Sequence, residues 1–244
     1  VTNGLEEMRL AERYLHTGRI AEAERLFLRV LSLDENHFGA AFALGMLYHE
    51  GGRDELAMSM LKNAVARDPR AFAAVLNLGI IERRQGLLAD ARRHLHDAIQ
   101  LDPTSAHAQL SLAQLLVDLQ DPVAATAALE CARSLDEDNP EIAVRLGQLL
   151  AARGRNEEAA DAYRSILVRH PQCGEAHYGL SLLGVPFRNP ADIERMAEAI
   201  RSPITSTIDS VLLRLALASV HDELGNYPRA FAYLETANDA HRAS

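Results

Sequence analysis

Tryptophan is absent from the sequence, and aromatic residues make up only 5% of it. β-Sheets draw on aromatic and β-branched residues, so this shortage argues against a sheet-rich fold, and the frequent alanine and leucine favour close-packed helices. No stretch approaches the ~18 uninterrupted apolar residues of a membrane helix, and the first residues lack the basic head and apolar stretch of a signal peptide. We therefore predict an all-α protein without a membrane span, and we expect it in the cytoplasm.

Positive charge and cysteine are also scarce. The formal net charge is −9, and a protein that binds a nucleic-acid backbone needs a basic face, so we expect no nucleic-acid partner. Cys131 and Cys173 have no metal-ligand spacing, and we interpret them as two buried thiols. The chain begins with Val1 rather than Met, from which we expect it to be part of a longer protein.

The sequence does contain an internal repeat of 34 residues. Leucine recurs at this spacing, and the residue after it is always small. The leucines are Leu10, Leu44, Leu78, Leu112, Leu146 and Leu180. The same register holds in a turn column, which contains Gly18, Gly52, Gly86, Gln120 and Gly154, and in an alanine column, which contains Ala23, Ala57, Ala91, Ala125 and Ala159. A fixed period of this length indicates a stack of identical supersecondary units.

Each unit is predicted to be a hairpin of two antiparallel helices. Apolar residues follow the alanine column at helical spacing, and the glycine column supplies the turn between the helices. Pro69, Pro103 and Pro171 close three of the units, where the second helix must end. Because one hairpin cannot bury its apolar faces alone, we expect neighbouring hairpins to stack.

These residues resemble the signature of the tetratricopeptide repeat family. Leu10-Ala11-Tyr14 with Ala23 and Phe27, and Leu44-Gly45-Tyr48 with Ala57, Ala64 and Pro69, carry the resemblance. It implies a right-handed α-α superhelix, or solenoid, and the repeats give about seven helical hairpins. We predict one solenoid over residues 1–244, with five regular repeats over 4–173, a divergent hairpin over 174–210 and a final hairpin over 211–244.

The divergent hairpin departs from the pattern in its first helix. Gly184-Val185-Pro186 should end that helix early, and Asn189-Pro190 has the cap and first-turn proline of a new helix. This second helix should end near Pro203. The inserted residues are expected in the loop that follows, at residues 203–206.

In the family, the first helix of each repeat lines a concave groove, and the resemblance places the candidate partner-binding residues there. They are Phe42, Met46, Leu76, Asn77, Ile80, Arg83, Arg84, Leu110, Gln114 and Arg145. An apolar centre flanked by arginines suits an extended or helical peptide with some acidic character. The alternative is that the apolar residues pack between neighbouring helices and the arginines are ordinary solvated side chains. Family grooves that clamp a chaperone carboxylate, or that carry an asparagine ladder, are not matched, because only Asn77 fits.

No catalytic or metal constellation is found in the sequence. His94 and His96 are two residues apart on a helix and point to different faces, and we expect the histidines on the surface. There is no Gly-x-Ser-x-Gly motif, no recognisable Cys–His pair and no glycine-rich phosphate loop. We therefore predict a non-enzymatic protein-interaction scaffold without cofactor or metal, whose partner is a protein or peptide.

The last repeat suggests an alternative. Asp222-Glu223-Leu224-Gly225, Tyr227, Ala230-Phe231 and Ala237-Asn238 resemble the repeat that precedes the catalytic domain of bacterial repeat-containing sulfotransferases. This implies a non-catalytic N-terminal arm of a larger transferase, with the catalytic domain after Ser244. A further possibility is self-association through the C-terminal hairpin, because the helix over 231–237 has an apolar face without a polar cap.

Overall fold

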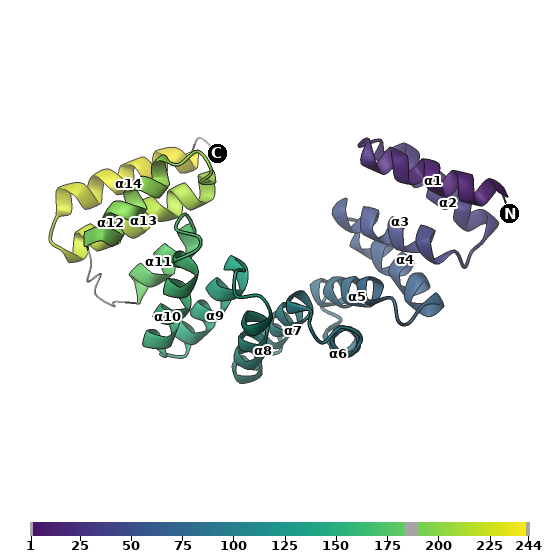
Figure 1. Cartoon of the computed structure of the whole chain (residues 1–244), viewed down its shortest axis with the longest axis horizontal. Coiled ribbons are helices and arrows are strands. Elements are labelled where there is room, and N and C mark those ends of the chain that lie inside the picture. The colour runs from purple at the N-terminus through teal and green to yellow at the C-terminus, as the bar shows by residue number, and fades with distance from the viewer. Residues whose placement is uncertain (1, 184–189, 243–244) are drawn as a thin grey trace. The chain divides into compact units, whose positions relative to one another are not determined.

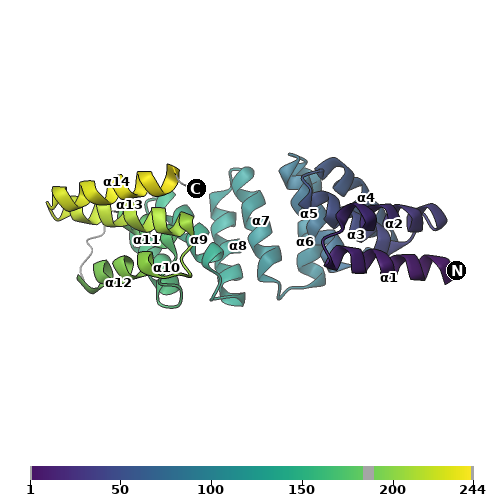
Figure 2. The same ribbon diagram turned by 90° about the horizontal axis from the view of Figure 1, so that it is seen from above.

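The computed structural model describes residues 2–183 and 190–242, and within these ranges it contains fourteen α-helices and no strand. The helices divide into two compact units, residues 1–121 and residues 122–244. Figures 1 and 2 show the helices of each unit in chain order. The prediction of an all-α fold built from about seven helical hairpins is confirmed.

The first unit contains seven helices. They are α1 (Thr2–His16), α2 (Ile20–Leu33), α3 (Phe38–Glu50), α4 (Asp54–Arg67), α5 (Phe72–Arg84), α6 (Leu88–Leu101) and α7 (Ala106–Asp118). Helices α1, α3 and α5 each pack against the helix that follows, and α2, α4 and α6 each also contact the first helix of the next repeat. One side of every second helix is therefore buried between two first helices.

The second unit contains the remaining seven helices. They are α8 (Pro122–Leu135), α9 (Pro140–Ala152), α10 (Asn156–Leu167), α11 (Gly174–Leu182), α12 (Pro190–Arg201), α13 (Thr207–Glu223) and α14 (Tyr227–Arg242). Helix α9 pairs with α10, and α13 pairs with α14 along its length, as Figures 1 and 2 both show. Helices α11 and α12 both pack against α13.

The turn column works as the sequence predicts. The φ angles of the turn glycines lie between +69° and +74°, at Gly18, Gly52, Gly86 and Gly154. A backbone hydrogen bond closes each turn, such as the 2.8 Å bond from Arg19 N to Tyr14 O. Glycine adopts this left-handed conformation without steric cost and so ends the first helix of the hairpin. Gln120 occupies the same column with φ +58°.

The small-residue column lets the two helices of a hairpin approach closely. A Cβ atom added to Gly45 would lie 2.7 Å from Leu61 Cγ, and one added to Gly147 would lie 2.5 Å from the ring of Tyr163. Real carbon atoms do not come this close, so only glycine fits where the facing residue is large. Fully buried side chains such as Phe27 and Leu95 fill the space between the helices.

The divergent region of the second unit agrees with the sequence in part. Helix α11 is only nine residues long, α12 begins at Pro190, and it ends at Arg201, close to the expected Pro203. The predicted helix breaker at 184–186 and the cap at Asn189 lie outside the described residues.

The prediction of two buried thiols is wrong for Cys131. The thiol is free and exposed, because Ala128, Leu129 and Ala132 occupy the packed side of α8. Cys173 is also free, and it is half-buried just before α11.

Candidate functional site

In the first unit, the predicted groove residues differ in exposure. Leu76 on α5 and Leu110 on α7 are only 3% and 4% exposed, so they pack between helices as the alternative interpretation holds. Phe42 and Met46 on α3 and Ile80 on α5 are half-buried and keep some accessible apolar surface. The ring of Phe42 stacks on Phe38 at 5.9 Å between centroids, which fixes its orientation.

The two arginines beside these residues are already paired. Arg83 contacts Asp118 Oδ2 at 2.8 Å and Gln114 Oε1 at 3.0 Å, which joins α5 to α7. Arg84 lies 3.2 Å from Asp54. These partners neutralise much of the positive charge of the two arginines, from which the sequence analysis expected a ligand with acidic character.

Asn77 also has an internal partner, because its side-chain amide donates a 2.7 Å hydrogen bond to Ala73 O on the same helix. Its carbonyl oxygen remains as an acceptor. A ligand could therefore meet one free polar atom of this side chain.

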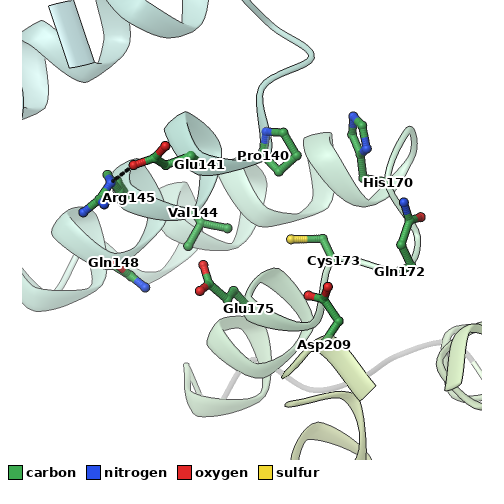
Figure 3. A pocket seen from close by; sticks show the side chains of 10 residues that line it. All are labelled: Pro140, Glu141, Val144, Arg145, Gln148, His170, Gln172, Cys173, Glu175 and Asp209. Atoms are coloured by element: carbon green, nitrogen blue, oxygen red, sulfur yellow. Dashed lines mark hydrogen bonds and ion pairs between the residues drawn. The ribbon is translucent and has the colours of Figure 1, made fainter. Parts of the chain in front are cut away.

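The second unit contains a pocket of about 570 Å³ on its first helices (Figure 3). Its lining includes the predicted site residue Arg145. The ten lining residues are Pro140, Glu141, Val144, Arg145, Gln148, His170, Gln172, Cys173, Glu175 and Asp209. They come from α9, from the loop before α11 and from the first turns of α11 and α13.

The polar groups of the pocket differ in how they are satisfied. Arg145 Nε pairs with Glu141 Oε1 at 2.8 Å. Asp209 accepts hydrogen bonds from the Gly174 backbone N–H at 2.9 Å and from the Ser206 hydroxyl at 2.6 Å, which ties the start of α11 to the start of α13. The side chain of Glu175 has no hydrogen bond or ion pair with any residue in the described part of the chain.

Cys173 lies in the middle of this arrangement. Figure 3 shows its sulfur pointing into the pocket, with the carboxylates of Glu175 and Asp209 facing the same space and Val144 across from them. Burial raises the pKa of the Cys173 thiol, and the nearby Asp209 and Glu175 raise it further. The thiol is therefore favoured in its neutral form.

Three of the histidines contradict the surface location that we predicted, whereas His16, His96 and His107 are exposed as expected. His94, His177 and His221 are only 5–6% exposed. His94 Nδ1 lies 2.5 Å from Glu82 Oε2, and Glu82 is fully buried. Burial lowers the pKa of His177 and of His221. Helical periodicity could have placed His94 on the packed side of α6, since Ala91, Leu95 and Ala98 share that side.

Sequence reasoning did not predict the three acidic pocket residues. Glu141 and Glu175 are 34 residues apart and occupy one column of the repeat, at the starts of α9 and α11. Asp209 follows the inserted residues at 203–206, where the register is displaced by three, so it belongs to a different column. The predicted site residues lie further along the first helices.

The last helix also has an accessible apolar face. Tyr227, Phe231 and Leu234 on α14 are 66%, 62% and 42% exposed, whereas Ala230 and Ala237 face inward. The predicted self-association through this hairpin stays a prediction.

No group of three or more His, Cys, Asp or Glu in residues 2–183 and 190–242 is arranged to hold a metal ion. None of the helices in these ranges combines the length and apolar character needed to cross a membrane.

Comparison with protein families gives two matching models, both described as tetratricopeptide repeat. One matches residues 8–62, 57–106 and 77–140, and the other matches residues 116–183. No significant match exists among curated proteins.

Solved structures give a consistent result for the fold. The chain is similar to PilF of Pseudomonas aeruginosa, with a TM-score of 0.68, 20% identity and coverage of 85% of this chain and 94% of that one. A tetratricopeptide repeat protein from Parabacteroides merdae aligns with a TM-score of 0.68 and 13% identity over 98% and 94% of the two chains. A thermophilic TPR protein from Thermus thermophilus aligns with a TM-score of 0.55 and 26% identity over 74% and 98%.

Proposed function

This chain belongs to the tetratricopeptide repeat family, and from that premise we propose that it binds an extended partner segment on the first-helix surface of its second unit. Repeats of this family generally act as protein-interaction scaffolds, typically without catalysis. The observation that carries the proposal is the pocket between α9, α11 and α13, which opens beside Arg145. A concave site with a few convergent polar groups is the usual form of a ligand site.

Two residue types suit this pocket to a partner segment. The exposed amide of Gln148 can pair with a main-chain N–H or C=O, and the half-buried Pro140 supplies accessible apolar surface. In the first unit, the accessible apolar surface of Phe42, Met46 and Ile80 is the part of the predicted groove that we retain as a second contact surface.

The test uses a random peptide library displayed on phage and selected against the full chain. Enriched peptides are then measured against Gln148→Arg, which places a long charged side chain in the pocket, and against the matched control Gln100→Arg on an exposed position of α6. We expect Gln148→Arg to weaken binding about tenfold, because steric exclusion of one buried contact removes roughly 1.4 kcal/mol. Equal binding by both variants, or no enriched peptide, would overturn the proposal.

The sulfotransferase-like alternative rests on residues 215–244 alone. The family-model matches end at residue 183, so they do not cover that segment. The alternative stays a prediction, and the sequence of the parent gene after Ser244 tests it directly.

A further inference from the structure

Three acidic residues line the pocket of the second unit. Glu141, Glu175 and Asp209 lie in the first turns of α9, α11 and α13. Glu141 and Glu175 occupy equivalent positions of stacked repeats, which lie side by side, and Asp209 comes from the last repeat, whose register is displaced by three residues.

Internal partners cancel only part of this charge. Glu141 is offset by Arg145 at 2.8 Å. Asp209 accepts hydrogen bonds from neutral donors, the Gly174 N–H and the Ser206 hydroxyl, which leave its charge in place. His170, the other basic group of the lining, contacts Asp138 at 3.1 Å. Two carboxylates, those of Glu175 and Asp209, therefore have no counter-ion among the residues that the structure describes.

The rest of the lining is suited to an apolar stem. Pro140 at the start of α9 is half-buried and gives the pocket accessible apolar surface, and the thiol of Cys173 lies between it and the two carboxylates (Figure 3). Lysine and arginine have this combination of an aliphatic stem and a cationic head, and charge-assisted bonds to carboxylates are among the stronger polar contacts. A volume of about 570 Å³ leaves room for one such side chain with part of its backbone.

We propose that the pocket binds an arginine or lysine side chain of the partner segment, with the head between Glu175 and Asp209 and the stem against Pro140 and Cys173. This inference rests on the proposed function, and it reverses the acidic partner expected from the arginines of the sequence. Arg83, Arg84 and Arg145 are all ion-paired within the protein.

The experiment follows amide resonances of the isotope-labelled full chain during titration with acetyl-arginine amide. Acetyl-leucine amide and acetyl-glutamate amide serve as matched probes. We expect the arginine probe alone to shift the resonances of Gly174 and Glu175. Its apparent Kd should rise as salt is added, because salt screens the charge interaction. Equal shifts with all three probes would overturn the inference.

The variant Glu175→Gln removes one charge at an exposed position and keeps the shape of the side chain. We expect it to weaken binding of the arginine probe at least about threefold, as for a partly exposed charge pair. The control is Glu157→Gln, an exposed glutamate of α10 outside the pocket, which should bind like the wild type. Asp209→Asn is a second variant, since asparagine keeps an oxygen to accept the Gly174 N–H. If neither pocket variant weakens binding, the inference is wrong.

The two proposals fail in different ways. If phage-selected peptides lose affinity for Gln148→Arg but contain no basic residue at the sensitive position, the scaffold function stands and the charge preference is wrong. If the arginine probe binds but no selected peptide responds to Gln148→Arg, the pocket chemistry stands and the proposed binding surface is wrong.

Discussion

At the scale of single residues, the feature furthest from the sequence prediction is the buried pair of Glu82 and His94. The carboxylate of Glu82 is fully buried, lies 2.5 Å from His94 Nδ1, and has its second oxygen 3.9 Å from Lys62 Nζ, the single lysine of the chain. A carboxylate without water needs both partners nearby, because burial of an isolated charge is strongly unfavourable. The pair joins α5 to α6 within one hairpin.

Replacement of one partner should therefore be costly. We expect His94→Leu to lower the free energy of unfolding by about 3 kcal/mol, because it leaves Glu82 buried beside only a distant ammonium group. The double variant Glu82→Leu/His94→Leu should recover part of this loss. Urea denaturation followed by circular dichroism measures both, and a double variant less stable than His94→Leu would contradict the explanation.

At the scale of helices and turns, the repeat columns predicted most of what the structure shows. The turn glycines and the small residues of the first helices could be placed from sequence because each has one steric reason that recurs in every repeat. The accessible residues of the apolar groove could not be placed from sequence. Periodicity predicts which face of a helix is apolar, but it does not show which of those side chains the next helix covers. Leu76 is buried and Met46 is half-buried although both were assigned to the same groove.

Gln120 is the exception in the turn column and gives a direct test. Its φ of +58° places a side chain in the left-handed region, which costs roughly 1–2 kcal/mol for most residues. We expect Gln120→Gly to raise the free energy of unfolding by about 0.5 kcal/mol, after the greater entropy of glycine in the unfolded chain is subtracted. The reverse change, Gly86→Ala, should destabilise the protein by about 1 kcal/mol. Denaturation midpoints that move in the opposite directions would contradict this account.

At the scale of the whole molecule, the sequence predicted the all-α class and the hairpins, but it gave no sign of the division into two compact units. It also could not show the pocket, which depends on how α9, α11 and α13 bring distant side chains together. Charge pairing was equally hidden, because Arg83 and Asp118 are 35 residues apart in the chain.

The buried histidines of the second unit should make its stability depend on pH. His177 and His221 both have pKa values lowered by burial, so the folded state holds them neutral more strongly than the unfolded state does. The contribution of these histidines to the free energy of unfolding is fully present above their unfolded-state pKa of about 6.5. It is lost as the pH falls through their lower pKa values in the folded state.

We therefore expect the melting temperature to fall between about pH 7.5 and about pH 5.5, and to fall less in a His177→Gln/His221→Gln variant. Thermal unfolding followed by circular dichroism at the two pH values gives the comparison. The exposed His96→Gln serves as control and should behave like the wild type. An equal fall in all three proteins would show that other groups govern the acid sensitivity.

The acidic residues at the first turns of α9, α11 and α13 have a consequence for how a partner is aligned along its length. Three successive first helices each contribute one carboxylate to the pocket, at fixed distances from one another. A partner with one basic residue could shift between neighbouring positions, whereas one with basic residues at the matching interval would be held in a single alignment. The second unit would then measure the spacing of charges along a chain as well as their sign.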